Sequence, residues 1–552
     1  MMRVRFLIIC CFCASISSAQ ESTPAEITAR IEALQSKEPN SPTLIQLHLD
    51  LGTALKLPEQ MPESEVAFRL AVKLAEKGVA DNPSNLPLQT IYRQAVEKLG
   101  AALARMHRWS EAEAVFKFGL DLTRKPRERT TLDLSDEARF LYLESELLIQ
   151  QLRYPEAAER ATSCAEVYAA LVKNAPNDKD YALRQAEHSR YLGRILLASG
   201  DARSAETSLR QAVTFAEKLV NDAPENEKFA AARFRNVNDL ALALREAGQF
   251  MAAEQTYLSA LKQAQAILDR DPKAVAKQKS VSALYRNLSN LHAPHLSAKQ
   301  AGEYRDQADK IVAQLPKAPL ETEQQFEENI LQISAVGVQQ LNQIEAKDYH
   351  AKMQMLAKKF PAVPFYRYQQ IRSGVMVFSK DSLQGKTTEA IALFGECQTQ
   401  AKQLADDFPN VPAYGYLLAT HSVEEFSVLL QRGKIKEAAE FFPKCDAHWQ
   451  QLIKANAKNA FVAKMYSEVL TLPLMFCQQR GEYELALQIA QVIFEAKARL
   501  SKQFPETVEH QRQAATLWRN VYLIYNMNRN PEAAEQALRH AISGWEQITK
   551  QY

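Results

Sequence analysis

The stretch that decides the fold is RFRNVNDLALALREAGQFMAAEQTYLSALKQAQAILDRDP, residues 233–272. Apolar residues recur three or four positions apart on both sides of Gly248, which is the spacing of two amphipathic helices. The small side chains of Ala241, Ala253 and Ala260 let two helices approach closely, and Gly248 permits a tight reversal between them. The stretch therefore predicts an antiparallel helical hairpin.

The same pattern returns along the chain at a period of 48 residues. The loops carry Pro176, Pro224 and Pro272, each 48 residues after the last, and later Pro361 and Pro409 at the same spacing. A hairpin cannot bury its apolar face alone, but stacked neighbours bury a continuous core. We therefore expect an all-α solenoid of about eleven stacked hairpins.

The residues around Gly248 resemble the tetratricopeptide repeat (TPR). Gly248, Phe250, Ala253, Tyr257 and Ala260 occupy the slots of its Gly-x-Tyr-x-x-Ala-x-x-x-Phe-x-x-Ala pattern. The usual repeat has about 34 residues, so this form has longer helices and is similar to the repeats of exported planctomycete TPR proteins. The resemblance implies a right-handed superhelix whose first helices line a concave, peptide-binding groove.

The N-terminus predicts a secretory signal over residues 1–19. Arg3 and Arg5 precede an apolar run, and Ser17 and Ala19 supply the small residues that signal peptidase requires. The rival interpretation is a retained membrane anchor, but the run from residue 6 to residue 16 is shorter than the roughly 20 residues that a spanning helix needs. We expect an exported protein, periplasmic or secreted, with no integral membrane segment in the mature chain.

Four parts follow from these boundaries. After the signal, residues 20–42 are expected to hold a cap helix and a linker. Residues 43–315 form an N-terminal TPR-like solenoid and residues 320–552 a C-terminal one, because the run LPKAPLETE at 315–323 interrupts the register.

The charge balance of the sequence argues against partners that bind through a large net charge of the protein. The whole chain has 67 basic and 65 acidic residues, and the predicted signal removes only Arg3 and Arg5, which leaves 65 of each. A neutral mature chain does not predict a nucleic-acid partner or an anionic membrane surface.

Sequence motifs for catalysis or cofactor binding are missing. There is no phosphate loop, no His-Glu-x-x-His and no Cys-x-x-Cys in the mature chain. His292 and His295 have a metal-like spacing but no third ligand, so we expect no metal site. Cys164, Cys397 and Cys445 occupy small-residue slots and are expected to replace alanine in the core. We expect no cofactor, and a protein that is not an enzyme.

Two surfaces are candidates for partner binding. The first is a basic and amide-rich face of three successive first helices, where guanidinium groups suit a peptide carboxylate. Its members are Arg190, Arg194, Arg235, Asn238, Arg245, Arg286 and Asn290. The second is an aromatic patch of Trp518, Tyr522 and Tyr525 on the last first helix; its alternative role is contact with the end of the stack.

The sequence therefore favours a non-catalytic exported scaffold that binds a protein or a peptide through the concave groove. One alternative is a structural or assembly factor of the cell envelope with the same fold, for which self-association stays open. The other is an enzyme whose site has no recognisable motif.

Overall fold

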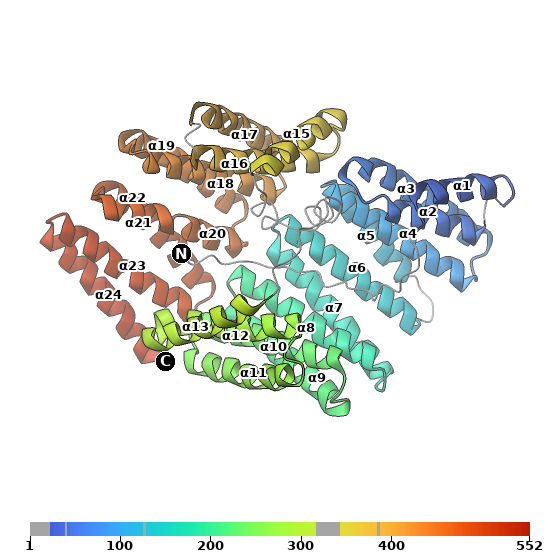
Figure 1. The fold of residues 1–552 in the computed structure, drawn as a ribbon, viewed down its shortest axis with the longest axis horizontal. Coiled ribbons are helices and arrows are strands. Elements are labelled where there is room, and N and C mark those ends of the chain that lie inside the picture. The colour runs from blue at the N-terminus through green and yellow to red at the C-terminus, as the bar shows by residue number, and fades with distance from the viewer. Residues whose placement is uncertain (1–21, 39–40, 125–128, 316–342, 384–386, 552) are drawn as a thin grey trace. The chain divides into compact units, whose positions relative to one another are not determined.

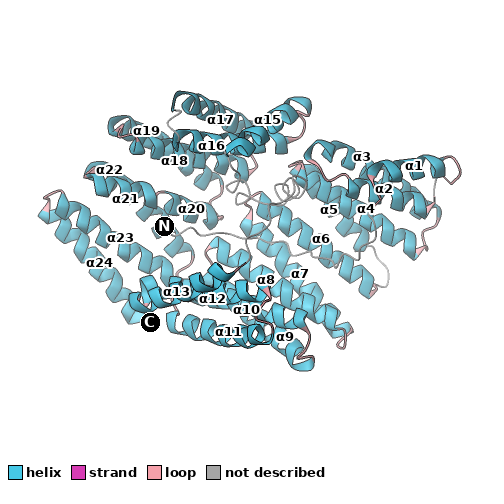
Figure 2. Cartoon of the chain, in the orientation of Figure 1, coloured by secondary structure: helices cyan, strands magenta, loops and turns pink. Residues whose placement is uncertain are grey.

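The computed structural model describes residues 22–38, 41–124, 129–315, 343–383 and 387–551. Within these ranges the regular structure is α-helical apart from one turn of 3-10 helix, and none of it is strand (Figure 2). The helices follow one another as packed pairs along the chain, coloured in order in Figure 1. The all-α helical-repeat prediction is confirmed. The predicted signal over 1–19 lies outside the described residues.

Contacts divide the chain into two compact units, and the first ends at Ala102. It contains α1 (Pro24–Gln35), α2 (Pro42–Ala54), the 3-10 turn η1 (Pro58–Gln60), α3 (Met61–Asp81) and most of α4 (Leu86–Arg105). Thr23 and Glu26 form a capping box at the start of α1, and buried Ile27 and Ile31 pack against α2. A helix, α1, thus lies within residues 20–42, and its role as the cap of a solenoid stays a prediction.

The second unit runs from Leu103 to Tyr552. Its helices before the gap at 316–342 are α5 (Trp109–Thr123), α6 (Thr131–Gln150), α7 (Tyr154–Asn174), α8 (Lys179–Ser199), α9 (Ala202–Asp222), α10 (Glu227–Glu246), α11 (Phe250–Arg270), α12 (Val275–His295) and α13 (Ala298–Gln314). Those after it are α15 (Gln343–Lys359), α16 (Pro364–Leu383), α17 (Thr387–Asp407), α18 (Pro412–Gln431), α19 (Ile435–Ala455), α20 (Ala460–Val469), α21 (Thr471–Arg480), α22 (Tyr483–Gln503), α23 (Val508–Met527) and α24 (Pro531–Gln551).

The hairpin turns share one backbone conformation. Gly200, Gly248, Gly433 and Gly481 have φ between 71° and 94°, in the left-handed region that glycine adopts without a steric penalty. His107, Leu152 and Arg529 occupy the corresponding turns with φ of 58°, 61° and 56°. The reversal predicted at Gly248 is confirmed, and the repeat imposes the same reversal where the sequence has no glycine.

The small-residue slots bring paired helices together in two ways. A side chain at Gly193 would place its Cβ 2.5 Å from Leu209 Cγ, so α8 and α9 meet only because that atom is missing. Where serine fills the slot, its hydroxyl donates to a carbonyl of the partner helix: Ser145 to Ala157 at 2.8 Å, and Ser289 to Ala301 at 2.7 Å. Both solutions leave the approaching backbone without a clash or an unpaired polar atom.

A seam joins early and late hairpins of the second unit. The Phe365 amide donates to the Met106 carbonyl at 3.2 Å, and the Tyr414 hydroxyl lies 3.3 Å from His107 Nδ1. Further along, Asn459 donates to the Leu152 carbonyl.

The seam continues at Gly200, whose carbonyl lies 2.9 Å from His510 Nε2 and 3.5 Å from the Thr507 hydroxyl. Turns after α4, α6 and α8 therefore contact the starts of α16, α18, α20 and α23 in chain order. The boundary expected at residues 316–319 lies outside the described residues, so that division stays a prediction.

Aromatic packing fills the seam. The His107 ring stacks on Trp109 at 4.4 Å, and Trp109 stacks on Tyr414 at 5.1 Å between centroids. Tyr154 stacks on Phe461 at 4.4 Å. Burial lowers the pKa of His107 to about 3 and that of His510 to about 4, so both seam histidines are neutral at pH 7.

One described stretch, Ala460–Arg480, is long and apolar enough by composition to cross a membrane, although 56% of its apolar window is buried in the fold. It consists of α20 and α21, which meet at Leu470. Tyr466 and Leu474 on these helices belong to the core that α18, α19 and α22 share. The packing accounts for its apolar character as that of a core segment.

Candidate functional site

The arginines predicted for the concave face lie on α8, α10 and α12, where they form a ladder between successive helices. Arg190 Nη1 lies 2.9 Å from Asp239 Oδ2, and Arg235 Nη2 lies 3.3 Å from Glu187 Oε1. At the next step, an Asn287 side-chain amide donates to the Asn238 side-chain carbonyl at 2.8 Å. Each contact spans 48 or 49 residues, so it joins equivalent places in adjacent hairpins.

The other members of that face make longer ion pairs, contact a neighbouring residue of the same helix or are exposed. Arg194 is 3.9 Å from Asp239, and Arg286 is 3.9 Å from Asp309. Arg245 contacts Glu246 at 2.7 Å, while Asn290 is exposed. The structure thus places the predicted residues on three neighbouring helices but gives the arginines acidic partners from the same chain. A carboxylate ligand would have to compete with those partners, and the predicted site stays a prediction.

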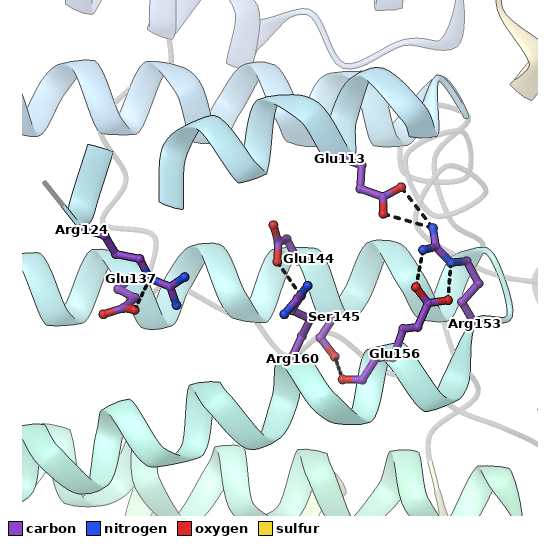
Figure 3. A network of polar contacts seen from close by, with 9 residues as sticks. Glu113, Arg124, Glu137, Glu144, Ser145, Arg153, Glu156 and Arg160 are labelled. Carbon is purple, nitrogen blue, oxygen red and sulfur yellow. Dashed lines mark hydrogen bonds and ion pairs between the residues drawn. The ribbon is translucent and has the colours of Figure 1, made fainter. Parts of the chain in front are cut away.

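Charged residues on α5, α6 and α7 likewise hold the hairpins together (Figure 3). Arg153, in the turn before α7, contacts Glu156 on α7 and Glu113 on α5, with two Nη1–oxygen distances of 3.1 Å to the latter. Arg160 lies 3.0 Å from Glu144, and Arg124 lies 2.6 Å from Glu137. These carboxylates are engaged in ion pairs between neighbouring helices, which is a structural role.

The aromatic patch leads to a concavity of the second unit. A groove of about 510 Å³ lies between α19, α22 and α23. Thirteen residues line it: Phe442, Pro443, Asp446, Leu487, Gln488, Ala490, Gln491, Val492, Phe494, Leu517, Trp518, Val521 and Tyr525. Its volume falls in the range of about 300–1,000 Å³ that is usual for ligand pockets.

The structure brings part of the predicted patch into this groove. Trp518 is fixed there by the edge of Phe494, at 4.9 Å, and by the His540 ring of α24, which stacks on it at 4.6 Å. Tyr525 lines the groove two turns later on the same face of α23. Tyr522 is not part of the wall but packs against the core beside it. Two of the three predicted aromatic residues therefore share one site.

Sequence reasoning missed the opposite wall, which α19 and α22 provide. Phe442, Leu487 and Val492 read as ordinary core positions of second helices. One signal was available, because Pro443 lies inside α19, where proline removes a backbone donor and disturbs helix packing.

Asp446 is the single charged residue among the thirteen that line the groove. Its Oδ1 accepts from the Tyr466 hydroxyl at 2.8 Å and from the Gln450 amide at 3.1 Å. Burial, and then the Asp446 charge, raise the pKa of Tyr466 above its usual range, so the phenol stays protonated as a donor. These two donors fix the carboxylate in place.

A second group of charges lies next to the seam, on α20, α22 and α23. Lys497 donates to Gln513 Oε1 at 2.7 Å, and Arg512 contacts Glu509 through two 2.6 Å hydrogen bonds. Burial lowers the pKa of Lys497 to about 8, although Glu468 and Glu509 act in the opposite sense. Burial within the fold, beside charges of its own chain, accounts for the shifted pKa of this amine.

The remaining perturbed groups suit packing better than catalysis. Cys164, Cys397, Cys445 and Cys477 are buried and unpaired, and burial raises the pKa of each thiol to about 12. A thiol of that kind is a small apolar filler, as the sequence predicted for Cys164, Cys397 and Cys445, and a poor nucleophile. In the described part of the chain, no three His, Cys, Asp or Glu residues converge in a way that would hold a metal ion.

Comparison with known proteins gives no family for this chain. No family model matches it, and no curated protein matches its sequence. Among solved structures, it is similar to a Rap protein complexed with competence and sporulation factor, at 12% identity and a TM-score of 0.34 over 92% of this chain and 99% of that one. A monomeric IFIT1 mutant with Gppp-AAAA matches at 13% identity and a TM-score of 0.28, over 95% of each chain.

A third similar structure is BtubC (BKLC) from P. vanneervenii, at 15% identity and a TM-score of 0.35 over 48% of this chain and 96% of that one. At such identities and TM-scores, no site and no role can be transferred from those structures to this chain. The function therefore has to come from the residues of this chain.

Proposed function

We propose that this chain is a non-catalytic, exported scaffold of the long-helix TPR type that binds a protein or peptide partner. The observation that carries the proposal is the groove between α19, α22 and α23, which presents Trp518 and Tyr525 beside apolar walls. Trp and Tyr are the residues that most often dominate binding energy at protein interfaces, because they combine large apolar area with few rotatable bonds.

The volume of the groove limits the size of the ligand that can bind in it. A cavity of about 510 Å³ holds a few side chains of a partner, not a folded domain. Its walls come from three helices of three successive hairpins, which are packed through the shared core of Ile489, Ile493 and Leu517. A groove on rigid elements loses little entropy when it binds, so a short segment can anchor there.

The absence of catalysis is part of the proposal. Supporting it, the arginines on α8, α10 and α12 contact acidic side chains of the same chain, and the four thiols are buried with raised pKa values. Export rests on the sequence of residues 1–19 alone. N-terminal sequencing of the natural protein should return Gln20, and recovery of Met1 would contradict export.

Crosslinking tests the binding role. A photoreactive phenylalanine derivative at Tyr525 should capture a discrete partner from the envelope or secreted fraction, which mass spectrometry then identifies. The same group at Tyr181, which lies on α8 outside the groove, serves as the matched control. Capture at both sites alike, or at neither, would contradict the proposal.

A further inference from the structure

We propose that the groove between α19, α22 and α23 binds a cationic side chain, arginine or lysine, carried by an apolar segment of the partner. This inference rests on the proposed function and names the chemistry of the partner at the same site. It follows from the single charge that the groove presents, a carboxylate set among aromatic rings.

The first step is the charge of the groove. Asp446 is the only charged residue in its wall, and both described donors to it, Tyr466 and Gln450, contact the same oxygen, Oδ1. Among the described residues, Oδ2 has no partner. A carboxylate oxygen at an apolar wall favours a charge-assisted hydrogen bond from an incoming donor, and a guanidinium or ammonium group supplies one.

The second step is the other polar groups of the wall, which are neutral. Gln488, Gln491, Trp518 and Tyr525 carry amide, indole and hydroxyl groups, and the Gln491 amide nitrogen donates to Glu495 Oε1 at 2.9 Å. An anionic side chain would meet Asp446 with no cation in the wall to offset the repulsion.

The third step is the aromatic lining. Four aromatic residues, Phe442, Phe494, Trp518 and Tyr525, line the groove, and aromatic rings attract cations through their quadrupole. The neighbouring cation on α19, Lys444, lies over the Phe441 ring at 5.4 Å and is not part of the wall. Elsewhere in the unit, Arg480 lies over Phe476 at 4.6 Å, which shows the same pairing within the chain.

These steps together define the occupant. Besides Asp446 and Gln488, the groove is lined by eleven residues that are apolar, aromatic or already hydrogen-bonded. They suit leucine-like or aromatic side chains on either side of the cation in the partner segment. The cation then occupies the one position where a carboxylate oxygen is open. A segment such as Leu-Arg-Leu has this character, whereas its glutamate or glutamine counterparts do not.

A random dodecapeptide library displayed on phage provides the probe. It is selected in parallel on the mature chain and on its Trp518→Ala, Asp446→Asn and Asp406→Asn variants, the last being an exposed aspartate of α17 outside the groove. We expect peptides enriched in Arg or Lys between apolar residues on the unaltered chain and on Asp406→Asn. The basic enrichment should disappear on Asp446→Asn, and the peptides should not be retained on Trp518→Ala.

A selected peptide then gives the size of the effect by fluorescence anisotropy. Replacing its Arg by Gln should weaken binding at least tenfold to the unaltered chain and less than twofold to Asp446→Asn, because the cation and the carboxylate act as a pair. Asparagine can still accept from Tyr466, and circular dichroism verifies that each variant keeps its helicity.

The outcomes separate the two proposals. Peptides that depend on Trp518 but show no basic enrichment would overturn the cation assignment and leave the scaffold function standing. If no selected peptide depends on Trp518, the groove is not the binding surface, and the proposed function fails with it.

Discussion

His510 makes the seam of the second unit sensitive to acid, and the size of this effect can be worked out. The ring is buried, with 6% of its surface exposed, and its Nε2 lies 2.9 Å from the Gly200 carbonyl. Burial lowers its pKa from 6.5 to about 4, while Lys464 and Lys497 act in the same sense and Glu246 opposes them. Between pH 4 and pH 6.5, His510 is therefore protonated in the unfolded chain but neutral in the folded seam.

The sign of the effect follows from linkage. Stability from this group is fully present above pH 6.5, falls as the pH drops, and levels off below about pH 4. At pH 5 the loss is about 2 kcal/mol, because each pKa unit corresponds to about 1.4 kcal/mol and 1.5 units separate pH 5 from the unfolded value.

Hydrogen exchange at the turn 199–205 measures the opening free energy at pH 7.5 and at pH 5.0, after correction for the intrinsic exchange rates. From pH 7.5 to pH 5.0, the opening free energy of the unaltered chain should fall by about 2 kcal/mol more than that of His510→Gln. In this variant glutamine keeps a donor for the Gly200 carbonyl. The control is His448→Gln: burial lowers the pKa of His448 too, but it contacts Ser422 on α18 and not the seam. Equal pH dependence in the unaltered chain and in His510→Gln would refute the reasoning.

Three further predictions address packing, turns and the basic face. Gly193→Leu should destabilise the unit by about 1–3 kcal/mol in urea unfolding, because its Cβ would lie 2.5 Å from a leucine of α9, and faster amide exchange should spread only to adjacent hairpins. Arg529→Gly should raise stability by about 1 kcal/mol, since Arg529 holds a φ of 56° on an exposed turn. The Arg194→Ala, Arg286→Ala double variant should change the affinity for a captured partner less than threefold; a loss of two orders of magnitude or more would restore the basic face as the site.

The repeat architecture was accessible from the sequence because its signals are local. The 48-residue period, the small residues at Gly193 and Ala241, and the glycine at Gly248 all act within one hairpin. The turns at Leu152 and Arg529 keep the reversal without glycine, since packing of the flanking helices imposes the backbone there.

The ion-pair ladder could have been predicted from the sequence, because its partners lie about one repeat apart. Glu187 lies 48 residues before Arg235, and Asp239 lies 49 after Arg190, so these spacings equal the repeat period or exceed it by one residue. Predicting the ladder requires that each arginine be paired with an acidic residue one repeat away. The predicted face is basic only when the arginines are considered without these acidic residues.

The seam and the groove depend on contacts that no local pattern encodes. His107 and Tyr414 are 307 residues apart, and so are Leu152 and Asn459. The walls of the groove use core-like residues such as Phe442 and Val492, whose repeat positions give no sign that a cavity remains between them. Only the aromatic residues of α23 stood out in the sequence, and they led to one side of the site.

The central claim is that a partner anchors on Trp518, and the affinity of one crosslinked partner for two tryptophan variants tests it most directly. Trp545 on α24 is the matched control, being 38% exposed and outside the groove. With helicity equal in both variants, Trp518→Ala should weaken binding at least about thirtyfold, as loss of a hot-spot anchor worth about 2 kcal/mol does, and Trp545→Ala should leave it within twofold. Equal affinity of the two variants for the partner would contradict the claim.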